Sequence, residues 1–393
     1  MDDAVTPGSA MTNKAAPVPI LFLDGGLGTS LEDKYHITFS TDTPLWSSHL
    51  LLSQSESDGL PILRKCQADF ALAGADIILT ATYQASLEAF RASGVTCRQE
   101  VVSKYVSEAV KSAADAASIT ADRRNVENKD GTTEKVPGVR RGGVALAIGP
   151  YGATMIPSAE YSGKYDEQHD QVETLTEWHW ERFNALFAPL EDELLDRLDY
   201  IAFETVPRVD EILAVRRVMD RVKMALPNSR LANLPVWISC LYPGEGNTLP
   251  DGSSVDEVFE ALLGNTGAAE GIRTMPWGIG INCTKVAKLP SLVKQYEEAV
   301  RGRVESGDLS DWPSLVVYPD GTNGEVYNTE TKKWEVPDGA DVPKTPWETQ
   351  LAAVVRSADG TGQWRSILVG GCCKTTDRDI KELRATVLER SSC

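Results

Sequence analysis

The sequence lacks any hydrophobic run long enough to cross a membrane. No stretch of about 18 uncharged apolar residues occurs, and the start, MDDAVTPGSAMTNKAAPVP, has neither the basic nor the apolar segment of a secretion signal. We therefore expect a soluble, cytoplasmic protein. Residues 1–17 are expected to form a flexible N-terminal tail, and residues 18–393 a single folded domain.

Positive charge is also scarce. Lys and Arg number 39 against 57 Asp and Glu, which gives a formal net charge of −18. Such a chain repels phosphate backbones and anionic lipid surfaces. We expect small-molecule substrates and no nucleic-acid or membrane partner, in a monomer or a simple homo-oligomer.

The cysteines do not suit a disulfide framework. Seven of them occur in 393 residues, an odd number, without a secretion signal. This usage is typical of a reducing compartment, where thiols serve metal binding or catalysis. Cys66, Cys97, Cys240 and Cys393 follow no pattern, and we interpret them as structural.

Eight short apolar segments predict eight buried strands, at 20–24, 75–80, 143–149, 199–204, 235–240, 277–282, 314–319 and 366–371. Between and after them, apolar residues spaced three and four apart predict helices at 56–73, 98–117, 170–194, 208–225, 254–263, 287–304, 346–357 and 376–390. Strands alternating with helices indicate a parallel sheet, and eight such units favour a single (β/α)₈ TIM barrel. An open, doubly wound sheet is the structural alternative.

Three polar stretches lie outside the segments that a minimal barrel needs, at 119–143, 242–254 and about 320–345. We predict that all three are loop insertions. The second and third follow strands, so they are expected on the catalytic face and could overhang a pocket there.

Three cysteines fall just past the ends of predicted strands. Cys283 follows 277–282, and Cys372 and Cys373 follow 366–371. In a closed barrel these strand ends converge, and thiolates are preferred Zn²⁺ ligands. Three cysteine ligands leave a fourth position open for a thiol substrate, whereas a single such cysteine would more often be a small buried hydrophobe. The four histidines lie away from strand ends and are not predicted to be ligands.

Two acids and a glycine pair occupy further strand ends. Asp24 and Glu204 could bind the ammonium group of an amino acid, although each could instead pair with a basic residue of the barrel. Gly25 and Gly26 allow backbone N–H groups to approach a carboxylate closely. A dinucleotide-binding motif starting at Gly26 fails because leucine replaces its third glycine.

The segments LDGGLGTSLE, GADIILTATYQAS, AIGPYGA, DYIAFETVPRVDE, GIGINCT, VVYPDGTNGEVYN and LVGGCCKTT resemble the homocysteine S-methyltransferase family from about residue 20 to 390. The resemblance implies that Cys283, Cys372 and Cys373 hold a catalytic zinc ion, that Asp24 and Glu204 contact the homocysteine amino group, and that backbone near Gly25 and Gly26 receives its carboxylate. Gln84 stands where betaine-using relatives carry an aromatic residue. This departure favours a sulfonium donor, S-methylmethionine first and S-adenosylmethionine second, with methionine as product.

Two functions of other classes stay open. One is a non-catalytic barrel that binds zinc or thiols, or senses redox state through its vicinal cysteines. The other is a lyase or aldolase that uses a lysine Schiff base, but no predicted strand ends in lysine.

Overall fold

The structure is a computed structural model that describes residues 18–40, 42–53, 59–127, 142–264, 274–322, 325–328, 333–336 and 344–389. The predicted tail at 1–17 and Cys393 lie outside this range. Among the described residues, no helix combines the length and the apolar character needed to span a membrane.

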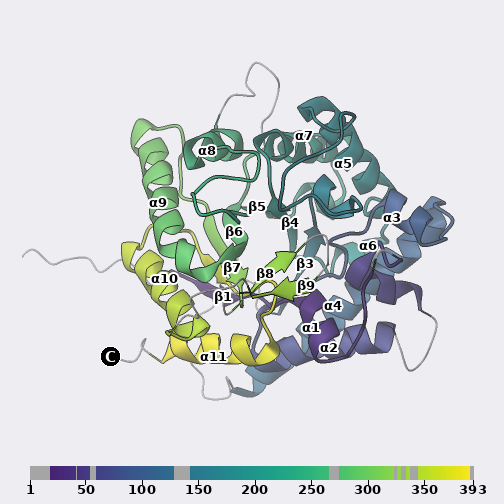
Figure 1. Cartoon of the computed structure of the whole chain (residues 1–393), viewed down its shortest axis with the longest axis horizontal. Helices are drawn as coiled ribbons and strands as arrows, with labels where there is room; N and C mark the ends of the chain where they lie inside the picture. Colours follow the sequence, from purple (N-terminus) through teal and green to yellow (C-terminus); the bar gives the residue numbers. More distant parts are fainter. Residues whose placement is uncertain are drawn as a thin grey trace, which may run out of the picture.

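Eight parallel strands form the centre of the molecule (Figure 1). Their order is β1-β10-β7-β6-β5-β4-β3-β2, and a parallel bridge between Leu23 and Ile77 joins the two end strands. The sheet therefore closes, which confirms the TIM barrel and excludes the open sheet. The strands are β1 (Ile20–Phe22), β2 (Ile77–Leu79), β3 (Gly143–Ile148), β4 (Tyr200–Val206), β5 (Val236–Cys240), β6 (Gly278–Lys285), β7 (Ser314–Asp320) and β10 (Ile367–Val369).

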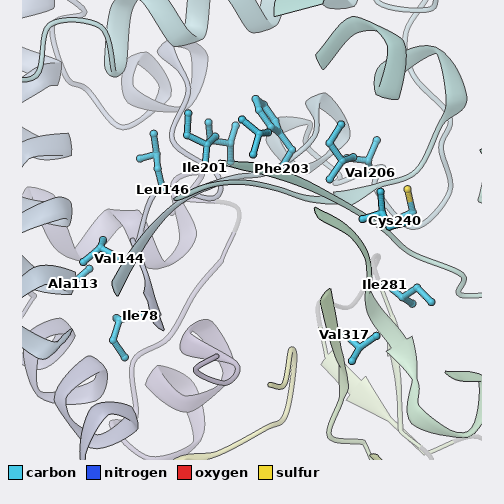
Figure 2. Close-up of a cluster of buried hydrophobic side chains, with 14 of the residues drawn as sticks. Ile78, Ala113, Val144, Leu146, Ile201, Phe203, Val206, Cys240, Ile281 and Val317 are labelled. Atoms are coloured by element: carbon cyan, nitrogen blue, oxygen red, sulfur yellow. The ribbon is translucent and has the colours of Figure 1, made fainter. Parts of the chain in front are cut away.

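Side chains on the two faces of each strand build two separate cores. On β4, Tyr200 and Ala202 point into the barrel, where they pack with Trp237. Ile201 and Phe203 alternate with them and face the surrounding helices, as part of the outer cluster in Figure 2. Because both faces are buried, the strands carry the continuous apolar runs on which their prediction rests.

A ring of helices covers the barrel (Figure 1). Most begin and end within a few residues of the prediction, although the segment expected at 170–194 divides into two helices, α5 and α6. Five short helices, α1, η1, α3, η3 and η4, were not predicted. The helices are α1 (Leu27–Asp33), η1 (Trp46–Leu52), α2 (Leu60–Ala73), α3 (Leu87–Ala92), α4 (Gln99–Glu127), η3 (Tyr151–Thr154), α5 (Val172–Leu186), α6 (Asp192–Leu195), α7 (Val209–Ala225), η4 (Arg230–Ala232), α8 (Val255–Leu263), η5 (Val286–Lys288), α9 (Leu289–Ser306), α10 (Trp347–Thr361) and α11 (Asp377–Leu388).

The first insertion is partly helical, so the prediction of a loop over 119–143 was wrong at its start. Helix α4 continues through Glu127, because no proline or glycine interrupts the sequence before Gly131. Residues 128–141 lie outside the described part of the chain.

The second insertion, 242–254, is a loop, as predicted, but none of its residues lines the cavity described below. Lys288 Nζ fixes it by donating to the carbonyl oxygens of Tyr242, Gly244 and Gly246 at 2.5–2.8 Å. The third insertion contains a two-stranded hairpin, β8 (Val326–Asn328) and β9 (Lys333–Glu335), rather than loop alone.

Candidate active site and metal centre

One cavity at the C-terminal ends of the strands gathers all seven predicted site residues: Asp24, Gly25, Gly26, Glu204, Cys283, Cys372 and Cys373. They come from the ends of β1, β4, β6 and β10, which lie far apart in the sequence. This is the face on which TIM-barrel enzymes carry their active sites.

Local backbone irregularities aim two of the strand ends into the cavity. Along β6, Ile279 and Ile281 face the helices, so strict alternation would turn Cys283 outward as well. Instead the pairing of β6 with β7 shifts register between Asn282 and Lys285, and Cys283 adopts a φ of 46°. A bulge of this kind re-aims side chains, at a cost of about 1–3 kcal/mol for the strained residue. Both Asn282 and Cys283 consequently line the cavity.

The same device occurs at the end of β4. Thr205 has a φ of 58°, and the register against β5 shifts between Phe203 and Val206. Glu204 and Thr205 therefore both line the cavity, although they are consecutive residues. Strained non-glycine residues that cluster at one place are characteristic of functional sites.

Backbone hydrogen bonds fix the cysteine pair that follows β10. Cys372 N–H donates to Pro319 O at 2.8 Å, and Gly371 N–H donates to Asp24 O at 3.1 Å. Thr375 N–H returns to Cys372 O at 3.1 Å, which closes the turn. The pair is thus anchored to the ends of β7 and β1 before any ligand binds.

The three thiols are joined by an acid that the sequence prediction missed. Ligand atoms of Cys283, Cys372, Cys373 and Asp320 all lie within 4.8 Å of one another. Asp320 is the last residue of β7 and so lies at a strand end on the catalytic face, whereas the predicted insertion at about 320–345 includes it. Its place directly after an apolar strand is the signal that could have identified it.

The chemistry of this group fits a divalent metal ion. Asp320 is buried, and its Oδ1 has no hydrogen-bond partner among the described residues. Burial raises the pKa of this carboxyl from 3.8 to about 7. The thiol contact with Cys372, together with burial, raises the pKa of Cys283 well above the ordinary thiol range. Buried acids of this kind ionise only beside a compensating cation, and thiolates with a carboxylate suit Zn²⁺.

Asn282 connects the strained residues to the sulfur atoms. Its Oδ1 accepts from Thr205 N–H at 2.9 Å, and its Nδ2 donates to Thr205 Oγ1 at 2.7 Å. The same Nδ2 approaches Cys283 Sγ at 3.4 Å. The amide thus holds the ends of β4 and β6 together and directs a donor at a thiol.

Asp24 and Glu204 form a second acidic group inside the cavity. Burial raises the pKa of Asp24 from 3.8 to about 7, although Leu79 N–H donates to its Oδ2 at 2.9 Å. Burial also raises the pKa of Glu204 from 4.5 to about 8, and the Asp24 charge adds to this shift. Neither acid forms an ion pair within the described residues, so the expected alternative of a barrel Lys or Arg partner finds no support there. Both acids are therefore available to a cationic ligand.

The glycine pair brings backbone close to this acidic group. A Cβ on Gly25 would lie 2.6 Å from the Phe70 ring, and one on Gly26 would collide with Cys372 O. Gly26 N–H donates to Thr375 O at 3.0 Å. Only glycine fits at these two positions, because the turns after β1 and β10 pack directly together.

The lining of the cavity also contains aromatic rings and another acid. Trp46, Tyr83, Tyr161 and Glu160 line it, and none of them was predicted. Gln84 also lines the cavity and donates to Ala153 O at 3.3 Å. Among the described residues that line this cavity there is no Lys, Arg or His, so the cavity is complementary to cations.

One expectation about lysine is corrected. Strand β6 ends in Lys285, because pairing with β7 resumes beyond the bulge. The Lys285 side chain is exposed and does not line the cavity, so the structure does not favour a Schiff base there.

Comparison with known proteins agrees with this geometry. The sequence profile of the homocysteine S-methyltransferase family matches residues 21–387. Homocysteine S-methyltransferase YbgG of Bacillus subtilis is 27% identical, with 93% of this chain and 94% of that protein covered. A selenocysteine Se-methyltransferase of Brassica oleracea is 29% identical, with 94% and 89% covered. The metallated form of the homocysteine methyltransferase MmuM from Escherichia coli superposes with a TM-score of 0.56 at 25% identity, with 93% and 96% covered. The chain belongs to the homocysteine S-methyltransferase family.

Proposed function

We propose that this enzyme transfers a methyl group from a sulfonium donor to the thiolate of L-homocysteine in a zinc-dependent reaction that gives methionine. The observation that carries the proposal is the shared cavity: the three thiols, which cluster with Asp320, line the same acidic chamber as Asp24 and Glu204. The selenocysteine-methylating relative supports a thiol or selenol amino acid as the acceptor class.

Cys283, Cys372 and Cys373 would hold the metal. The orphaned carboxylate oxygen of Asp320 supports a cation at the same place. Zinc bound there would lower the pKa of the homocysteine thiol, which is the chemistry that the metal supplies.

Asp24 and Glu204 bind and orient the acceptor in this proposal. An ammonium group between the two carboxyls favours their ionised forms and offsets the burial that raises their pKa values. The hydroxyl of Tyr318, which also lines the cavity, opposes the rise in the pKa of Glu204. Gly25 and Gly26 line the same cavity, which brings their backbone next to the position proposed for the acceptor.

The aromatic residues of the cavity accommodate the donor. Trp46, Tyr83 and Tyr161 present ring surfaces that attract a sulfonium cation, and Glu160 adds negative charge. The acceptor thiolate attacks the methyl carbon in line, the carbon–sulfur bond of the donor breaks, and the donor leaves as a neutral thioether. The thiol proton goes to solvent. S-methylmethionine is our first choice of donor and S-adenosylmethionine our second.

Product stoichiometry tests both parts of the proposal. Zinc-loaded protein receives homocysteine and S-methylmethionine under anaerobic conditions, and methionine is quantified. Two methionines per homocysteine are expected, because the demethylated donor is itself methionine. With S-adenosylmethionine, one methionine and one S-adenosylhomocysteine are expected.

Cys283→Ala is the control for metal dependence. The variant should bind less zinc and form no methionine. If zinc-replete wild-type protein transfers no methyl group from either donor, the proposed reaction is refuted. Stoichiometric zinc without turnover would then favour the non-catalytic zinc- or thiol-binding barrel.

A further inference from the structure

Helix α5 contributes two buried polar residues to the wall behind the donor side of the cavity. His179 and Arg182 lie one helical turn apart, and each is 2% exposed. The helix packs against α7 on the outside of the barrel (Figure 1). Polar groups buried this deeply are costly unless their hydrogen bonds are made, so their partners indicate what they do.

Arg182 binds backbone oxygens from two cavity loops. Its Nε donates to Ala85 O at 2.7 Å and its Nη2 donates to Tyr83 O at 2.7 Å, both in the loop after β2. Its Nη1 donates to Gly149 O at 2.6 Å, at the end of β3. The planar fork of a guanidinium matches three fixed acceptors, which the single ammonium of a lysine cannot reproduce. Tyr83 and Gln84, which line the donor side, are held between these bonds.

Glu211 fastens the next loop at both of its ends. This fully buried acid accepts from Tyr151 N–H at 2.6 Å and from Tyr165 Oη–H at 2.5 Å. Between these two anchors the chain carries Glu160 and Tyr161 into the cavity. Glu211 is the third residue of α7, where the helix N-terminus favours a negative charge.

His179 links the two halves of this network. Its Nε2 lies 2.8 Å from Glu211 Oε1, and because a carboxylate can only accept, His179 donates. Burial lowers the pKa of His179, so it donates as a neutral imidazole. One helix thus holds the loop after β2 through Arg182 and the loop after β3 through His179 and Glu211.

We propose that Arg182, His179 and Glu211 are positioning residues that fix the two loops forming the methyl-donor half of the cavity, an inference that rests on the proposed function. None of the three lines the cavity, so they act on the donor only through the loops. Loosening them should weaken donor use more than acceptor binding, because the thiols and the two acids stand on β1, β4, β6 and β10.

The chain offers a matched control in Arg216. It is also 2% exposed and also donates to backbone oxygens, those of Ala261 at 2.6 Å, Thr274 at 3.0 Å and Gly264 at 3.2 Å. None of these three residues lines the cavity. Arg182→Lys and Arg216→Lys therefore each remove a buried guanidinium group that binds backbone oxygens. Only the guanidinium of Arg182 binds the loops that line the cavity.

The test measures KM for donor and for homocysteine in both variants. Arg182→Lys should raise the donor KM about tenfold or more, because displaced loops bind the donor less tightly, and should leave the homocysteine KM within about twofold. Arg216→Lys should change neither KM, although both variants lose stability. An equal rise in donor KM in both variants, or a donor KM within about twofold of wild type in Arg182→Lys, would overturn the proposal.

Amide hydrogen exchange separates this inference from the proposed reaction. Arg182→Lys should accelerate exchange in residues 80–86, and Tyr165→Phe, which removes one hydroxyl from Glu211, should accelerate it in residues 151–165. Arg216→Lys should leave both segments unchanged. If wild-type protein transfers no methyl group, the proposed function fails, and the exchange data still decide whether the network holds these loops. Unchanged exchange in both segments would overturn the inference that Arg182, His179 and Glu211 hold these loops.

Discussion

Replacing Asn282 with alanine perturbs the link between the strained strand ends and the metal-binding thiols. The change removes the acceptor of Thr205 N–H and the donor to Thr205 Oγ1. Thr205 is 1% exposed, so its N–H is left unsatisfied, which costs about 1–3 kcal/mol, and the lost second hydrogen bond adds about 1 kcal/mol. We expect the free energy of unfolding to fall by about 2–4 kcal/mol.

The same change should weaken metal binding. Asn282 Nδ2 lies 3.4 Å from Cys283 Sγ and also fixes the backbone at Thr205, whose Oγ1 lies 3.6 Å from that sulfur. Residues that orient metal ligands in this way contribute about 10–100-fold to affinity. We therefore expect the zinc dissociation constant to rise by this factor in Asn282→Ala.

Two measurements check the prediction, urea unfolding of metal-free protein and competition with a zinc chelator. Gln67→Ala is the control, because Gln67 is a fully buried amide that donates to Leu79 O at 2.9 Å and accepts from Ser112 at 2.6 Å, and neither partner is a predicted metal ligand. It should lose stability and keep its zinc affinity. A zinc affinity within about twofold of wild type in Asn282→Ala would refute the role of the amide at the thiols.

The remaining predictions concern the ionisable groups. Cys373→Ser should reduce zinc bound per chain, measured by atomic absorption after gel filtration, and full retention would remove Cys373 from the ligand set. Asp320→Asn should weaken zinc binding in the absence of homocysteine by about tenfold in the chelator assay, and an unchanged affinity would show that this carboxylate does not contact the metal. Glu204→Gln should raise the homocysteine KM by at least about tenfold with little change in donor KM, and an unchanged homocysteine KM would contradict the ammonium site. Because the pKa of Glu204 is raised in the folded chain, to about 8, the folded state binds more protons than the unfolded state, and stability should fall as pH rises from about 4.5 to 8. Glu204→Gln should flatten this fall in urea melts of metal-free protein, and an identical slope would contradict the raised pKa.

Much of the fold could be predicted because its signal is local. Each strand is buried on both faces, so segments such as 143–149 and 314–319 are apolar throughout, and helices follow with their own periodicity. The three cysteines were predictable for the same reason. They immediately follow such strands, and the ends of parallel strands meet on one face.

The boundaries that were missed depend on packing and on weak local signals. Helix α4 runs through Glu127 although its last turns are polar, and β6 extends to Lys285 because β7 continues beside it. The hairpin β8-β9 contains only three residues in each strand, too few for a clear pattern of alternation.

By itself, the sequence determined that a barrel would form and that three thiols and two acids would lie at its strand ends. Both follow from local patterns, namely the alternation of strands with helices and the residues that directly follow each strand. Only the tertiary structure decided which other residues join them. Asp320 reaches the thiols because β7 lies between β6 and β10, and Asn282 reaches Thr205 across the end of β5 through two bulges. Arg182 and Glu211 act on loops about 100 and 50 residues away in sequence, and such contacts arise from packing between distant segments, for which no local pattern exists.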